Sequence, residues 1–243
     1  MDLSVIVPAK DEAANIVPLV REIQAALSGR FDYEIVCVDD GSEDGSLEAL
    51  RAAREAAGGR LRVLRHPRCC GQSTAVWNGV RSASGDVVAT LDGDGQNDPA
   101  DIPRLVELLC QRRQEGVRLV IGHRRRRSDS FLRLVSSRIA NRVRSALLKD
   151  QTPDTGCGLK VIRREHYLAL PYFDHMHRFL PALVQRQGGR VVSVPVNHRP
   201  RTRGRSKYGV NNRLWVGIVD LFGVIWLLRR ERRPATVSEE FPD

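Results

Sequence analysis

The sequence predicts an α/β fold in which a mostly parallel, Rossmann-like sheet carries helices on both faces. Short apolar runs of strand length recur along the chain, segments with apolar residues at helical spacing separate them, and acidic residues follow several of the runs. Parallel strands need crossover helices, and burial under those helices makes the strands continuously apolar. Ligands of such sheets bind beyond the carboxyl ends of the strands, so functional side chains are expected there.

Strands and helices alternate from the amino terminus onward. Leu3–Val7 is expected to be a buried strand, and residues 16–27 to form the next helix, because their apolar side chains recur at helical spacing. A second strand at residues 34–38 completes a βαβ unit. Further strands are expected at residues 61–64, 87–91 and 119–121, and further helices around residues 47–50, from about residue 73, and at residues 102–109.

Oxygen-bearing side chains follow the strand expected at residues 87–91. Asp92, Asp94 and Gln96 alternate there with two glycines. In an extended segment, side chains two positions apart point to the same side, and the glycines leave space for an ion and the phosphates it would bridge. Mg²⁺ and Mn²⁺ favour oxygen ligands and are the expected occupants. A solvated turn that carries two surface acids is the alternative.

Polar residues also follow the first two strands. Pro8–Glu12 closes the first strand, and Asp39 and Asp40 close the second. Because the carboxyl ends of parallel strands meet at one edge of a sheet, both segments are expected in the crevice that holds Asp92. For one of Asp39 and Asp40, a helix N-cap is as good an explanation as a ligand role.

Five short motifs occur in order and span most of the chain. They are Val5–Glu12, Ile35–Ser42, Asp92–Gln96, Asp154–Lys160 and Gly204–Tyr208. Together they resemble the inverting nucleotide-sugar glycosyltransferases of family 2, whose fold is called GT-A, and within that family the polyprenyl-phosphate sugar synthases that act on dolichyl or undecaprenyl phosphate. The resemblance implies a metal-dependent enzyme that transfers a sugar from a UDP- or GDP-sugar to a polyprenyl phosphate.

The resemblance assigns residues to the donor side of the site. It implies that the metal, Mg²⁺ or Mn²⁺, and through it the donor diphosphate, are held by Asp92, Asp94 and Gln96. Independently of the family, a departing nucleoside diphosphate gains negative charge, which a metal and fixed cations stabilise. The residues implied for the nucleoside pocket are Pro8, Ala9, Glu12 and Asp40, with Asp39 beside them.

Arg124 matches the position of a phosphate-binding arginine of the family. Here the sequence departs from the usual pattern, because the run Arg124–Arg127 offers four candidates. A solvated charge run is the alternative explanation for the other arginines of this run.

The acceptor side depends on the chemistry of the nucleophile. Asp154 stands at the family's general-base position, and a hydroxyl acceptor would need such a base because it must lose a proton. A phosphate acceptor is already an anion and needs cations instead. Arg133 and Ser137 match positions that bind the lipid phosphate, with Arg138 nearby; a helix that faces anionic lipid without chemistry is the alternative for both arginines. The residues implied for the loop over the reacting phosphates are Arg201 and Lys207.

The composition indicates an anionic partner. The chain has 39 Lys and Arg against 29 Asp and Glu, a net charge of +10 and a pI near 10.0. Such a surface favours nucleotide phosphates, nucleic acid or an acidic membrane leaflet. Aromatic residues make up only 5% of the chain, which leaves few stacking platforms for single strands, and no zinc-ligand spacing or recognition-helix pattern is evident. Nucleic acid is therefore not an expected partner.

Two segments favour a membrane surface. The segment from Leu132 places apolar residues on one face and basic residues, including Arg144, on the remainder, which is typical of an interfacial helix. Leu214–Leu228 is nearly all apolar, is followed by arginines, and is shorter than the roughly 20 residues that cross a bilayer. A buried core helix or an oligomer contact is the alternative for Leu214–Leu228. Attachment to the anionic membrane surface is expected to be peripheral or to use a separate membrane protein partner.

One catalytic domain is expected at residues 1–209. It divides into a nucleotide-sugar-binding half at 1–122 and an acceptor and membrane-facing part at 123–209. An interfacial segment at 210–233 and a disordered tail at 234–243 follow.

The protein is expected at the cytoplasmic face of the cell membrane. No signal peptide is evident, because the first apolar run has only the length of a strand. Five cysteines without metal spacing suit a reducing compartment, and Cys37 and Cys110 lie in apolar patterns that predict core positions. Three other functions are alternatives to polyprenyl-phosphate transfer: glycosylation of a saccharide or lipid hydroxyl, a non-catalytic role as the partner of a membrane protein, and nucleic-acid binding, which the composition disfavours.

Overall fold

The computed structural model describes residues 1–124, 144–145, 147–148, 150, 152–201 and 210–230. Within these residues, one sheet contains seven strands in the order β3-β2-β1-β4-β6-β5-β7. The strands are β1 (Leu3–Ala9), β2 (Tyr33–Asp39), β3 (Leu61–Arg65), β4 (Val87–Thr90), β5 (Val117–Arg124), β6 (Lys160–Arg163) and β7 (Arg190–Val196).

Most neighbouring strands run parallel, as predicted. β1 pairs in parallel with β2 and β4, β2 pairs with β3, and β5 pairs with β7. β6 is the exception, since it lies antiparallel to both β4 and β5. Neither β6 nor β7 is predicted from the sequence, and both join the sheet that the first 122 residues begin.

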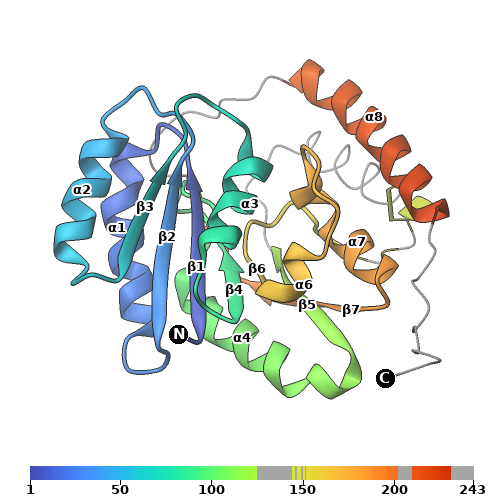
Figure 1. Ribbon diagram of the computed structural model, residues 1–243, viewed down its shortest axis with the longest axis horizontal. Helices are drawn as coiled ribbons and strands as arrows, with labels where there is room; N and C mark the ends of the chain where they lie inside the picture. The colour runs from blue at the N-terminus through green and yellow to red at the C-terminus, as the bar shows by residue number, and fades with distance from the viewer. Residues whose placement is uncertain (125–143, 146, 149, 151, 202–209, 231–243) are drawn as a thin grey trace, which may run out of the picture.

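Helices cover both faces of the sheet (Figure 1). The helices on one face are α1 (Ala13–Leu27), α2 (Ser46–Ala56) and α4 (Ile102–Gln111). Those on the other face are α3 (Gln72–Ser82), α6 (Arg164–Leu168), α7 (Leu180–Arg186) and α8 (Val210–Arg229). Side chains alternate along a strand, so the sheet has a hydrophobic core on each face. In β1, Leu3, Val5 and Val7 belong to the first core and Ile6 to the second.

The two cysteines that were predicted to lie in the core differ. Cys37, in β2, is buried in the first core. The prediction for Cys110 is wrong, because this residue lies on the outward side of α4, next to the buried Leu109, and is exposed.

Helix α8 packs one side on the second core. Val224 is 2% exposed, whereas Val219, Phe222 and Trp226 are each more than 60% exposed. Asp220 lies 2.9 Å from His175 Nδ1, which ties the helix to the domain. In the part of the chain that the structure describes, no helix is both long and apolar enough to cross a membrane.

Candidate active site

The polar residues singled out in the sequence gather at one edge of the sheet. β1, β2, β4 and β5 end at this edge, and β6, which runs in the opposite direction, begins there. Asp92 and Asp94 follow β4, and Arg124 is the last residue of β5. Asp154 precedes β6, and Lys160 is the first residue of β6. The antiparallel direction of β6 therefore adds a second set of charged residues to the crevice.

Asp92 is enclosed by protein and by a second acid. Gln72, at the start of α3, donates from Nε2 to Asp92 Oδ1 at 2.8 Å. A Cβ at Gly158 would lie 2.2 Å from Asp92 Oδ2, so any other residue there would displace the Asp92 carboxylate. Part of the Asp92 residue is exposed, but its carboxyl group is buried. This burial, followed by the charge of Asp94, raises the pKa of Asp92 to about 6, although the charges of Lys160 and Arg124 act to lower it. A divalent cation would relieve this repulsion.

Asp94 and Gln96 do not lie on an extended segment, so that premise of the sequence analysis is wrong. The chain turns at residues 93–95, where Gly95 has a φ of +72°. The backbone N–H of Gln96 donates to Asp94 Oδ1 at 3.1 Å. The Gln96 side chain donates from Nε2 to the Arg199 carbonyl at 3.3 Å. The metal-ligand roles of Asp92, Asp94 and Gln96 remain predictions.

Arg124 and Asp154 form a bidentate ion pair. Arg124 donates from Nε to Asp154 Oδ2 at 2.6 Å and from Nη2 to Oδ1 at 2.8 Å. Burial opposes the charged form of Arg124, but the hydrogen bonds and charge of Asp154 raise its pKa above the usual value. Both oxygens of Asp154 therefore orient a guanidinium, which suits a positioning role better than that of a general base. Of the run Arg124–Arg127, only Arg124 lies within the described residues.

Two enclosed cations were missed as site residues. Lys160 is 4% exposed and donates to the Cys157 carbonyl. Burial lowers the pKa of Lys160, and the charge of Lys160 acts to lower the pKa of Asp92. Arg144 was expected on the basic side of an interfacial helix, but its Nη1 donates to the hydroxyl of Thr155 and its Nη2 to the Thr152 carbonyl at 2.8 Å. The sequence contains two signals for Lys160: it ends the Asp154–Lys160 motif, and it opens an apolar run of strand length.

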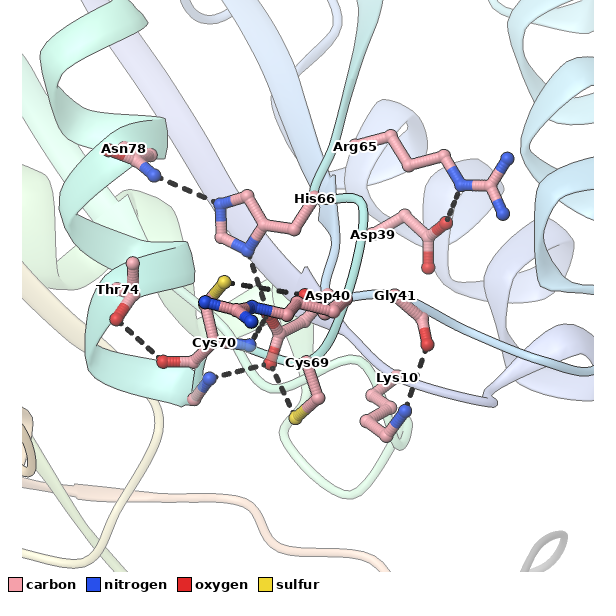
Figure 2. A network of polar contacts seen from close by, with 12 residues as sticks. Lys10, Asp39, Asp40, Gly41, Arg65, His66, Cys69, Cys70, Thr74 and Asn78 are labelled. Atoms are coloured by element: carbon pink, nitrogen blue, oxygen red, sulfur yellow. Dashed lines mark hydrogen bonds and ion pairs between the residues drawn. The ribbon is translucent and has the colours of Figure 1, made fainter.

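Asp40 is surrounded by donors of the protein (Figure 2). Its Oδ1 accepts from the backbone N–H of Cys70 at 2.8 Å and lies 2.7 Å from His66 Nδ1. Its Oδ2 accepts from the backbone N–H of Gly71 at 2.9 Å and from the thiol of Cys69 at 3.2 Å. Burial opposes ionisation of Asp40, but these hydrogen bonds, with His66 first, hold its pKa below the usual value. Asp40 therefore anchors the loop that leads into α3.

The other predicted donor-side residues also have protein partners. Asp39 is fully buried, accepts from the backbone N–H of Ser42 at 3.1 Å, and lies 3.2 Å from Arg65 Nε. Glu12 forms an ion pair with Arg201, which joins the loop after β1 to the segment after β7.

Pro8 and Ala9 end β1 beside the motif Asp92–Gln96. A Cβ at Gly93 would lie 3.0 Å from the Pro8 carbonyl and 3.3 Å from the Ala9 Cβ. This close approach brings the predicted nucleoside pocket next to the acid pair, Asp92 and Asp94. The predicted site residues that lie outside the described part of the chain are Arg133, Ser137, Arg138 and Lys207.

Solved structures share this fold. A glucosyl-3-phosphoglycerate synthase from Mycobacterium tuberculosis, in complex with Mn²⁺, UDP and glucosyl-3-phosphoglycerate, matches with a TM-score of 0.70 over 97% of this chain and 81% of that chain. The two sequences are 22% identical, so this similarity shows the fold alone and confirms the predicted GT-A architecture.

Named relatives align over most of this chain. A dodecaprenyl-phosphate galacturonate synthase from Rhizobium johnstonii is 36% identical over 238 residues, which cover 96% of this chain and 69% of the relative. An undecaprenyl-phosphate 4-deoxy-4-formamido-L-arabinose transferase from Aeromonas hydrophila is 35% identical over 209 residues, which cover 86% of this chain and 63% of the relative. The model of glycosyl transferase family 2 matches residues 4–170. The chain therefore belongs to glycosyl transferase family 2, as its five motifs predicted.

Proposed function

We propose that this protein transfers a sugar, with inversion, from a UDP- or GDP-sugar to a polyprenyl phosphate. The observation that carries this proposal is the acid pair Asp92 and Asp94 beside the enclosed cations Arg124 and Lys160 in a family 2 chain. The two relatives described above support the acceptor, because both names specify a polyprenyl phosphate.

The acid pair fits a hard divalent cation, Mg²⁺ or Mn²⁺. Both side chains offer carboxylate oxygens, and the charge of Asp94 raises the pKa of Asp92, so a cation would lower their repulsion. Asp92 and Asp94 would hold the ion, with Gln96 as the predicted third ligand. The solved synthase of the same fold contains Mn²⁺ together with UDP. When bound, such an ion stabilises the charge that develops on the departing nucleoside diphosphate.

The charged side chains of the crevice would position the reacting phosphates. Arg124, fixed by Asp154, offers a preorganised cation that needs no reorganisation during the reaction. A polyprenyl phosphate is already an anion, so it needs no base to remove a proton, and Asp154 acts by orienting Arg124. The predicted contacts to the phosphates come from Arg133, Ser137, Arg138, Arg201 and Lys207.

Helix α8 supports peripheral contact with an anionic membrane surface. Its outward side exposes Val219, Phe222 and Trp226, and the Arg230 guanidinium lies 5.9 Å from the centroid of the Trp226 ring. Apolar side chains beside arginines suit the boundary between lipid tails and head groups. We place this contact at the cytoplasmic face, made by the chain itself or together with a separate membrane protein partner.

A transfer assay tests the acceptor class. Purified protein is incubated with labelled UDP- and GDP-sugars, Mg²⁺ or Mn²⁺, and either undecaprenyl phosphate or a saccharide. We expect label in an organic-extractable product that mild acid releases, and only when the lipid phosphate is present. A water-soluble product that requires the saccharide would favour a hydroxyl acceptor, with Asp154 as its base. No product from any combination would favour the non-catalytic role.

A further inference from the structure

A second group of side chains with atoms that can bind a metal lies just after β2 and β3. In the sheet, β1 separates these two strands from β4 and its acid pair. It consists of Asp40, His66, Cys69 and Cys70 (Figure 2). One ligand atom each from Asp40, His66 and Cys70 lie within 4.8 Å of one another. The sulfur of Cys69 lies 3.2 Å from Asp40 Oδ2. Asp40, His66 and Cys70 thus bring one carboxylate, one imidazole and one thiol together, and Cys69 adds a second thiol beside Asp40.

The ligand set differs in kind from that of the acid pair. Sulfur and imidazole nitrogen favour Zn²⁺, whereas carboxylates alone favour Mg²⁺ or Mn²⁺. Tetrahedral Zn²⁺ places neighbouring ligand atoms about 3.3 to 3.8 Å apart, given its usual bond lengths. Two contacts to Asp40 are slightly shorter than this, at 2.7 Å from His66 Nδ1 and 3.2 Å from Cys69 Sγ. His66 and Cys69 therefore contact Asp40 directly in this structure, and a bound cation would replace these two contacts with bonds to the same atoms.

The group combines two fixed ligands with two adjustable ones. Asp40 and His66 are 4% and 9% exposed, whereas both cysteines are exposed. The loop that carries the cysteines is pressed against Gly41, where a Cβ would lie 2.5 Å from the backbone carbon of Arg68. The backbone is therefore held in place, while the exposed side chain of Cys70, whose thiol now donates to the Arg68 carbonyl at 3.3 Å, would change rotamer to bring its sulfur to the ion.

The surroundings of His66 also fit a metal ligand. Its Nε2 lies 2.9 Å from Asn78 Nδ2, and its Nδ1 faces Asp40. A metal on Nδ1 requires the proton on Nε2, and the Asn78 amide can then turn its oxygen to accept that proton. Such an outer partner fixes the tautomer and the ring orientation of a ligating histidine.

We propose that Asp40, His66, Cys69 and Cys70 bind one Zn²⁺ ion, separately from the hard cation of the acid pair. On binding, each thiol releases its proton to solvent, and His66 binds the ion through Nδ1 with a proton on Nε2. The usual zinc spacing is absent from the sequence because Asp40 reaches the group from another strand. If the proposed transferase function is correct, zinc binds the carboxylate of Asp40, which is predicted to line the nucleoside pocket. The binding of zinc itself does not depend on that function.

Direct metal titration of the full, metal-free chain tests this site. Zn²⁺ is titrated against a chromophoric chelator in excess Mg²⁺, and Co²⁺ serves as a spectroscopic substitute. We expect one Zn²⁺ per chain and a near-ultraviolet charge-transfer band from thiolate to Co²⁺. Cys69→Ser and Cys70→Ser should each weaken this band, and His66→Gln should change the visible spectrum of Co²⁺. Cys110→Ser, at an exposed thiol on α4, is the matched control and should change neither signal.

Asp94→Asn separates the two metal sites and should keep the bound zinc. Loss of zinc in Asp94→Asn with retention in both cysteine variants would assign the ion to the acid pair and overturn the proposal. An absence of stoichiometric zinc in the unmodified chain would also overturn it. If a serine variant fails to fold, alkylation of the unmodified chain gives the answer: zinc should protect Cys69 and Cys70, but not Cys110, from iodoacetamide. Equal alkylation with and without zinc would contradict the site.

Discussion

Two acid pairs lie at the ends of parallel strands on either side of β1, yet their surroundings are opposite: Asp39 and Asp40 at the end of β2, and Asp92 and Asp94 after β4. Asp40 accepts hydrogen bonds from two backbone N–H groups and a thiol and faces an imidazole nitrogen, and these contacts hold its pKa below the usual value although burial opposes ionisation. Asp92 has a hydrogen bond from Gln72 and a like charge from Asp94, and its pKa rises to about 6. Acidic residues at the ends of two strands thus include one carboxylate, Asp40, that organises a loop, and one, Asp92, whose repulsion by a second acid a cation would relieve.

The largest expected effect separates the two pairs by activity. Asp94→Asn should reduce sugar transfer at least ~100-fold, the scale of losing one major electrostatic stabiliser, while the fold stays intact. The side chain lies on a turn at a strand end and not in a core, so its removal should not unfold the protein. Single-turnover rates at saturating donor and metal measure this loss.

Asp86→Asn is the matched control for this variant. Asp86 is exposed and lies just before β4, at the opposite end of that strand. Its change should leave turnover unaltered. Full activity of Asp94→Asn in the presence of metal would remove the catalytic role of the acid pair.

The second effect concerns stability and falls on the other pair. Asp40→Asn should lower the free energy of unfolding by about 1.5–3 kcal/mol, because hydrogen bonds to a charged group are lost. The folded-state pKa of Asp40 is lowered, so its stabilisation is present above the unfolded pKa and is lost as the pH falls through the folded value. Urea denaturation near neutral pH should therefore show a difference that shrinks in acid. A difference that persists in acid would mean that Asp40 does not stabilise the fold through its charge.

A third, smaller effect tests the bidentate partner of Arg124. Asp154→Asn should reduce transfer to polyprenyl phosphate by less than the roughly 10²–10⁴-fold that a lost general base costs. The reason is that both oxygens of Asp154 bind Arg124. The pH profile of kcat/KM decides between the roles: loss of its acidic limb in Asp154→Asn would identify Asp154 as the base of a hydroxyl acceptor.

The smallest effect is a pH dependence of metal affinity. The pKa of Asp92 in the metal-free protein is raised to about 6, so a proton competes with the ion below that value. Mn²⁺ affinity should fall by up to about tenfold for each pH unit below that pKa and level off above it. The same raised pKa means that the contribution of Asp92 to stability declines as the pH rises from the unfolded value toward 6. An affinity that stays constant across this window would show that Asp92 is not a ligand.

The strands β1 to β5 could be predicted from the sequence, whereas β6 and β7 could not. β2 and β4 are buried along their whole length and β1 at every position except Pro8, which produces clear apolar runs. β6 has only four residues and begins with Lys160, and β7 lies at an edge and contains Arg190 and Pro195. A short run that opens with a charged residue and a run that a proline interrupts are weak strand signals.

The acid pairs could be located from strand ends, but their surroundings depend on distant contacts. Asp40 is satisfied by a loop about 30 residues further along the chain, and Arg124 is paired with a carboxylate 30 residues away. The turn at residues 93–95 likewise could not be inferred from the assumption of an extended segment. Pairings of this kind depend on tertiary packing, which short motifs do not encode.

Direct measurement of Mn²⁺ binding tests the central contrast between the two pairs. Free Mn²⁺ is monitored by its paramagnetic resonance during titration of the unmodified chain, Asp94→Asn and Asp40→Asn, with and without UDP. We predict that the unmodified chain and folded Asp40→Asn bind Mn²⁺, that UDP strengthens this binding, and that Asp94→Asn loses it. Equal Mn²⁺ binding by Asp94→Asn and the unmodified chain, or a loss confined to Asp40→Asn, would contradict the assignment of the acid pair as the hard-metal site.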